Sequence, residues 1–147
     1  MTTEGVSERL AALTGKTIVS IRRLHYVYKG RIDFESGGIE LVFSNGSAAL
    51  FGVGPDGEAL GLREAVWRDP FEEPLSTENR EFIEKSGKWT AFDVSKEPQY
   101  APLVGRAVLE VQRVVMPGGK ITGAAISTSA GTIRVIIGAD EVLVTVS

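Results

Sequence analysis

The chain of 147 residues carries a formal net charge of -3 at pH 7, with 43% hydrophobic and 24% charged residues, a composition typical of one soluble globular domain. It has no cysteine and one histidine, which excludes disulfide frameworks, zinc ribbons, cysteine nucleophiles and multi-histidine metal sites. The chain has 19 acidic and 16 basic residues, so we expect no nucleic acid partner. We also expect neither a metal nor a cofactor.

The amino-terminal region is predicted to form a short helix. Val6, Leu10 and Leu13 fall on one helical face, and Gly15 is placed to end the helix. Residues 1–9 are polar and lack the apolar core of a signal peptide, and apolar runs such as 135–137 are far shorter than a membrane span. We therefore expect a cytoplasmic protein without a membrane partner.

Two pairs of segments match one another in the same order along the chain. Residues 13–24 align without gaps over residues 103–114 at an offset of 90, and residues 38–47 align over residues 123–132 at an offset of 85. An ordered run of matches predicts an internal duplication in which the first copy carries about five extra residues. Chance similarity between two β-rich stretches is the alternative.

The predicted copies cover about residues 13–62 and 103–147 of a single domain, 1–147. In the first copy, apolar and polar residues alternate over 39–44 as in a half-buried strand, and Asn45-Gly46 favours a tight hairpin turn. Each copy is therefore predicted to be an antiparallel β-meander. The fold class is mainly β with some α+β character, and the meanders either close into a barrel or pack as two sheets.

Two further elements complete the prediction. A second helix is expected from about Thr77 to Ser86, capped by Ser76 or Thr77 and ended by Gly87. A last strand over 142–146 has no charged residue, and an uncharged strand at a sheet edge pairs readily with another chain. It is expected either to close a barrel within the monomer or to pair across a homodimer.

The only histidine lies in a hairpin that the second copy lacks. A carboxylate facing its imidazole can orient a general base, so an enzyme that uses His25 with Asp33 or Glu35 is one hypothesis. The favoured interpretation is an exposed β-ribbon without catalytic residues. It remains a secondary candidate for recognition, formed by His25, Tyr26, Tyr28, Asp33 and Glu35.

The connector between the copies, residues 63–100, gathers acidic and aromatic residues. It holds both tryptophans of the chain, and no aromatic residue follows Tyr100. Aromatic anchors within an acidic rim are typical of surfaces that bind basic proteins. The candidate binding residues are Trp67, Arg68, Asp69, Phe71, Glu72, Glu73 and Trp89. The alternative is a lid in which the large aromatic side chains cover an open end of the β core.

The favoured function is a non-enzymatic, cytoplasmic interaction protein that neutralises a basic protein partner. Small immunity proteins are of this general type, although no diagnostic motif supports the comparison. The first alternative is a β-barrel that holds a small molecule between the two copies beneath the Trp67 to Trp89 segment. The second alternative is the His25 enzyme.

Overall fold

A computed structural model describes residues 3–71 and 73–147, and the fold is mainly β, as predicted. In chain order the elements are α1 (Thr3–Ala11), β1 (Ile18–Tyr28), β2 (Arg31–Ile32), β3 (Ile39–Phe43), β4 (Ala48–Val53), β5 (Leu60–Arg63), α2 (Thr77–Ser86), β6 (Lys88–Asp93), the 3-10 helix η1 (Ala101–Leu103), β7 (Glu110–Val115), β8 (Ile121–Thr128), β9 (Gly131–Gly138) and β10 (Glu141–Val146). None of the described helices is long and apolar enough to cross a membrane.

The strands form two antiparallel sheets. In the first sheet the strands are paired in the order β2-β1-β3-β4-β5, and β6 also pairs with β1, on the edge opposite β2 and β3. The second sheet has the order β10-β9-β8-β7. The consecutive hairpins β3-β4 and β8-β9 lie where the sequence predicts meanders. Within the described residues the strands form two packed sheets, so the barrel alternative is not what the chain adopts.

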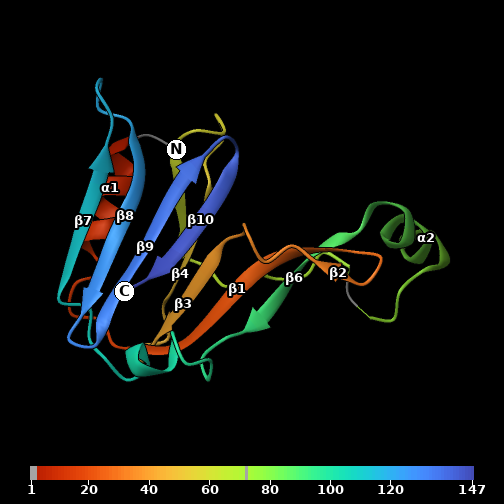
Figure 1. Ribbon diagram of the computed structural model, residues 1–147, viewed down its shortest axis with the longest axis horizontal. Coiled ribbons are helices and arrows are strands. Elements are labelled where there is room, and N and C mark those ends of the chain that lie inside the picture. The colour runs from red at the N-terminus through yellow and green to blue at the C-terminus, as the bar shows by residue number, and fades with distance from the viewer. Residues whose placement is uncertain (1–2, 72) are drawn as a thin grey trace.

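The space between the sheets is filled by apolar side chains. Ile21, Leu41 and Phe51 from the first sheet and Ile126 and Val135 from the second are completely buried. The first helix, α1, contacts β5, β7 and β8 and adds two of its apolar residues to this core (Figure 1). Strand alternation thus gives each sheet one apolar inner face and one outer face.

The sheets are also joined by backbone hydrogen bonds at one corner. There the segment before β1 lies antiparallel to the segment before β7, with Thr17 paired to Ala107. The bonds are reciprocal between positions matched in the sequence: Gly15 N–H to Val108 C=O at 2.8 Å, Gly105 N–H to Ile18 C=O at 2.7 Å, Ile18 N–H to Arg106 C=O at 2.9 Å and Val108 N–H to Lys16 C=O at 2.8 Å.

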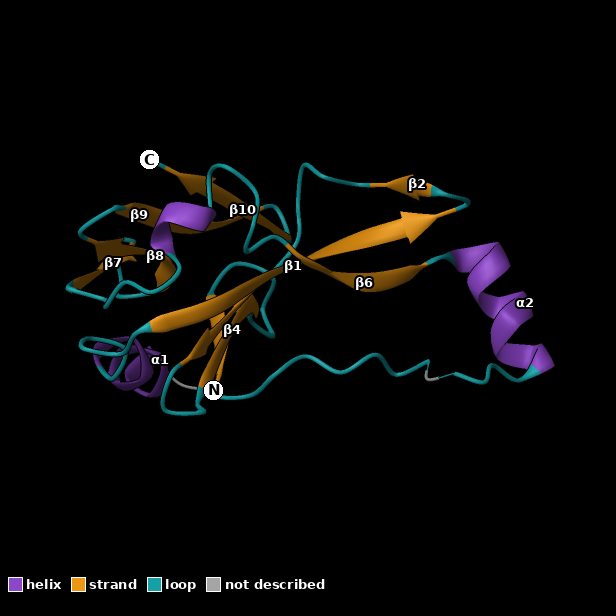
Figure 2. Ribbon diagram, turned by 90° about the horizontal axis from the view of Figure 1, so that it is seen from below, coloured by secondary structure: helices purple, strands orange, loops and turns teal. Residues whose placement is uncertain are grey.

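Part of the first sheet extends beyond the two-sheet body as an arm. Figures 1 and 2 show the second half of β1 projecting with β2 and β6, and α2 at the tip. The helix begins and ends where its caps predict, because Ser76 accepts a hydrogen bond from the Asn79 N–H and Gly87 follows the last turn. No strand was predicted at Lys88–Asp93, yet β6 runs along β1 from Asp93 opposite Arg22 to Lys88 opposite Val27.

Strand β10 is an edge strand of the second sheet. It pairs with β9 along its length, and on its other side the Val142 carbonyl accepts a hydrogen bond from the Gly37 N–H at 3.0 Å. The chain that enters β3 therefore touches the start of β10. This second contact between the sheets lies beside the candidate site described next.

Candidate functional site

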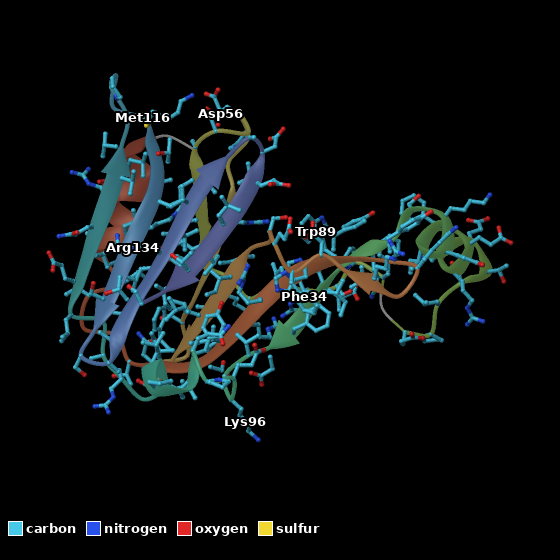
Figure 3. All side chains as sticks on the ribbon, viewed as in Figure 1. Phe34, Asp56, Trp89, Lys96, Met116 and Arg134 are labelled. Carbon is cyan, nitrogen blue, oxygen red and sulfur yellow. The ribbon has the colours of Figure 1, made fainter. Side chains whose placement is uncertain are left out.

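A pocket of about 580 Å³ lies on the outer face of the first sheet. Its walls come from β1, β4, β5 and β6, from the connector at Trp67, from the loop between β2 and β3, and from the β9-β10 turn. Figure 3 shows Trp89 where the arm leaves the body. The volume is within the range of pockets that bind small molecules or single anchor side chains.

Glycines form the floor of the pocket. Gly52 of β4 is paired with Gly61 of β5, and Gly38 lies beside the same strands, immediately before β3. A Cβ atom at Gly38 would lie 2.6 Å from the Phe51 carbonyl oxygen, whereas a Cβ atom at Gly52 would have no atom within 4 Å. The bare backbone at Gly52 therefore opens directly into the pocket.

Three aromatic side chains form the walls. Trp89 of β6 is the register partner of Tyr26 of β1, and their rings meet edge to face with centroids 5.3 Å apart. Trp67 from the connector also lines the pocket and is half-buried, while Trp89 is 46% exposed. The Tyr26 hydroxyl donates a hydrogen bond to the Ser86 carbonyl, which fixes the ring against the end of α2.

An ion pair between a half-buried arginine and a buried carboxylate holds Trp67 on the sheet. Glu40 of β3 is 1% exposed and accepts two hydrogen bonds from Arg22, each of 2.7 Å. The backbone of Trp67 is tied to the same pair, because its N–H donates to Glu40 at 2.6 Å and its carbonyl accepts from Arg22 at 2.9 Å. The hydrogen bond with Glu40 raises the pKa of Arg22 above its ordinary value, against the opposing effect of burial.

Beyond Trp67, the connector contacts the arm through two further side chains, Asp69 and Phe71. Asp69 forms an ion pair with Lys88 of β6, and the Phe71 ring stacks on Phe82 of α2 with centroids 5.7 Å apart. Burial opposes ionisation of Asp69, but hydrogen bonds from Lys88 and from the Phe71 N–H keep its pKa below the ordinary value. The first contact joins the connector to β6, and the second joins it to α2 at the tip of the arm (Figure 1).

Four charged residues line the pocket. Asp33 follows β2, Asp140 and Glu141 lie at the β9-β10 turn, and Arg63 ends β5. All four are exposed, and in the described part of the chain none of them forms an ion pair. The pocket therefore combines aromatic walls with three carboxylates and one guanidinium, and its net formal charge is negative.

The predicted connector site is only partly assembled at this pocket. Trp67 and Trp89 line it, whereas Asp69 and Phe71 act as ties, and the exposed Arg68 and Glu73 do not belong to its lining. Glu72 lies outside the described residues. Both tryptophans line the pocket on the outer face of the first sheet.

The predicted exposed ribbon around the histidine is wrong in one respect. His25 is only 5% exposed, because its Nδ1 lies 2.9 Å from the Ser36 carbonyl and its ring contacts Phe34 and Phe92. It points to the side of the arm opposite the pocket; Figure 3 shows Phe34 and Trp89 on opposite sides of the ribbon. Of this secondary set, Tyr26 and Asp33 line the pocket, while Tyr28 and Glu35 are exposed elsewhere.

Sequence reasoning missed several residues of the pocket. Arg63, Asp140 and Glu141 carry no local motif, and their neighbourhood arises from pairing between distant strands. The glycines did carry a signal, because Gly52 and Gly61 interrupt otherwise apolar strand patterns, and strand glycines often mark a close approach of a ligand or another chain.

Comparison with known proteins identifies no relative of this chain. Searches against protein-family models, curated proteins and solved structures found no match for this chain. Among residues 3–71 and 73–147, no group of three or more His, Cys, Asp or Glu side chains is arranged to hold a metal ion.

Proposed function

We propose that the protein is a non-enzymatic recognition module that binds a basic protein partner by holding one cationic side chain in the Trp67–Trp89 pocket. The single observation that carries the proposal is the joint lining of one hollow by Trp67, Trp89, Tyr26 and carboxylates that form no ion pair among the described residues. A protein that neutralises a basic partner, in the manner of an immunity protein, is one form that such a module takes.

The chemistry of the walls favours a cation. Indole and phenol rings attract an ammonium or guanidinium group through their negative faces, an interaction worth about 0.5 to 2 kcal/mol. The carboxylates of Asp33, Asp140 and Glu141 add attraction and accelerate encounter with a positively charged surface. Because Trp67 is held through its backbone by the Glu40–Arg22 pair, its side chain is positioned before the partner arrives.

The proposal is tested with a short peptide that contains one internal arginine, Ac-Gly-Ala-Arg-Ala-Gly-NH2. The chain has two tryptophans and both line the pocket, so binding should change the intrinsic fluorescence. The same peptide with citrulline, which has the shape of arginine without its charge, should bind at least tenfold more weakly. Equal binding of the two peptides would show that the pocket does not select a cation.

Variants locate the binding site. Trp89→Ala removes an aromatic wall and should weaken binding of the arginine peptide by about tenfold. Phe34→Ala is the matched control, because Phe34 is an exposed aromatic residue of the arm, 67% exposed, that does not line the pocket. Since Trp89→Ala also removes a fluorophore, the comparison uses calorimetry. If both variants bind like the wild type, the assignment of the site is wrong.

A small organic cation is a second candidate ligand, favoured by the volume of about 580 Å³. On this interpretation the ligand lies on the outer face of the first sheet and not between the two sheets, where the core is filled. A tetramethylammonium or benzylamine probe that binds more tightly than the arginine peptide would favour the small molecule.

We also infer that the two meanders are copies of one ancestral unit within a single domain. The reciprocal hydrogen bonds around Thr17 and Ala107 support this inference. So does the register, because Ser20 opposite Val42 in the first sheet corresponds in the sequence alignment to Glu110 opposite Ser127 in the second.

A further inference from the structure

Among the described residues that line the pocket, Arg63 is the one cation, and the other three charged residues are carboxylates. It shares a row across the first sheet with three other residues, in the order Arg22, Glu40, Leu50 and Arg63. Glu40 is already neutralised by the two hydrogen bonds from Arg22, and Leu50 separates it from Arg63 in the row. The guanidinium of Arg63 therefore faces the pocket without an internal counter-ion among the described residues.

A guanidinium without a counter-ion beside a binding site for a cation favours a ligand that carries both a negative and a positive charge. The planar fork of arginine matches a carboxylate through two parallel hydrogen bonds. A residue at the C-terminus of a chain carries an α-carboxylate, and if that residue is arginine or lysine it also carries a cation a few bonds away. Capture of a terminal carboxylate is a recurrent mode of peptide recognition.

We propose that the pocket binds the C-terminal residue of a partner chain that ends in arginine or lysine, with its α-carboxylate on Arg63 and its side chain between Trp67 and Trp89. This inference rests on the proposed function and adds which part of the partner enters. The floor suits a chain end, because no atom lies within 4 Å of the open side of Gly52, so main-chain atoms can approach the sheet closely.

The test compares three peptides of matched composition. They are Ac-Gly-Ala-Gly-Arg with a free carboxylate, the same peptide as its amide, and Ac-Arg-Gly-Ala-Gly-NH2, in which arginine is not terminal. In the wild-type protein the free acid should bind about tenfold more tightly than either of the others, because a charge-assisted contact is lost in both. Equal affinities would overturn the inference.

Two variants assign the preference to one side chain. Arg63→Gln should bring the ratio between acid and amide close to one without weakening binding of the amide. Arg134→Gln is the matched control, since Arg134 is an exposed strand arginine on the outer face of the second sheet (Figure 3), and it should keep the wild-type ratio. A tenfold preference that survives Arg63→Gln would overturn the role of Arg63.

The outcomes separate this inference from the proposed function. If no arginine peptide binds, the proposed function is wrong and the inference is wrong with it. If acid and amide bind equally and both require Trp89, the pocket for a cation stands and only its preference for a chain end is wrong. If free arginine, whose α-ammonium group is absent from the terminal residue of a peptide, binds more tightly than the tetrapeptide acid, the ligand is a free amino acid and the assignment to a protein chain is overturned.

Discussion

Comparable rows of paired residues run across the outer faces of the two sheets, but they carry different side chains. In the first sheet, Arg22 lies opposite Glu40, which lies opposite Leu50. The matched row of the second sheet is Gln112, Ala125 and Arg134. An ion pair that holds the connector thus occupies the place of a glutamine and an alanine.

The neighbouring row differs even more in bulk. In the first sheet it contains Gly38 and the paired Gly52 and Gly61, whereas the second sheet has Gly123, Ile136 and Leu143 in register. Ile136 and Leu143 are partly exposed and fill the surface of their sheet. The pocket therefore arises from two missing side chains together with a connector that supplies Trp67, and the backbone arrangement alone is insufficient.

The inner faces should be equivalent, and matched truncations test this most strongly. Leu41 in β3 and Ile126 in β8 occupy corresponding positions and are both completely buried. Leu41→Ala and Ile126→Ala should each lower the free energy of unfolding by about 3 to 4 kcal/mol, because each leaves a cavity in the shared core. Urea denaturation measures both values. A cost below about 1 kcal/mol for one variant alone would show that the two faces are not equivalent.

Removing only one member of the Arg22–Glu40 ion pair on the outer face should lower the free energy of unfolding more than removing both. Glu40→Ala leaves the half-buried Arg22 without its carboxylate partner and removes the acceptor for the Trp67 N–H, so we expect a loss of about 1 to 3 kcal/mol in unfolding free energy. The double variant Arg22→Gln/Glu40→Ala copies the second sheet and leaves no unpaired charge. It should be more stable than Glu40→Ala alone in thermal unfolding, and an additive loss would contradict this explanation.

Restoring a side chain on the glycine floor should abolish the difference between the outer faces. Gly52→Ile copies Ile136 and places its side chain in open space, so the unfolding free energy should stay within about 1 kcal/mol of the wild type. Affinity for the arginine peptide should fall at least tenfold, because the pocket is filled. Gln112→Ile, which adds the same side chain to the outer face of the second sheet, should bind normally. Full affinity in Gly52→Ile would exclude the floor from the site.

The smallest expected effect concerns the tie between the connector and the arm. The pKa of Asp69 is below its ordinary value of 3.8 in the folded protein, so its contribution is complete above about pH 4 and is lost as the pH falls through the folded pKa. This partly exposed pair should contribute less than about 1 kcal/mol. Tryptophan fluorescence should therefore change in acid, and Asp69→Asn should show much of that change at pH 7. An unchanged acid transition in Asp69→Asn would contradict the role of this tie.

Much of the fold could be predicted because its determinants are local. The alternation over Ile39–Phe43, the turn at Asn45-Gly46 and the cap at Ser76 each act within a few residues, and the strand, hairpin and helix form where these signals lie. Strand β6 was missed because Lys88–Asp93 has no periodic pattern of its own. Its strand conformation depends on pairing with β1, which lies about 65 residues away in the chain.

The sequence by itself determined a mainly β chain with two meanders, two short helices and an acidic, aromatic connector. Only the tertiary structure decided that Trp67 and Trp89 share a pocket with Arg63, Asp140 and Glu141, and that His25 lies on the other side of the arm. The physical reason is separation along the chain. Periodicity and capping are read from neighbouring residues, whereas this pocket is formed by pairing between distant strands and by hydrogen bonds that tie Trp67 to Arg22 and Glu40.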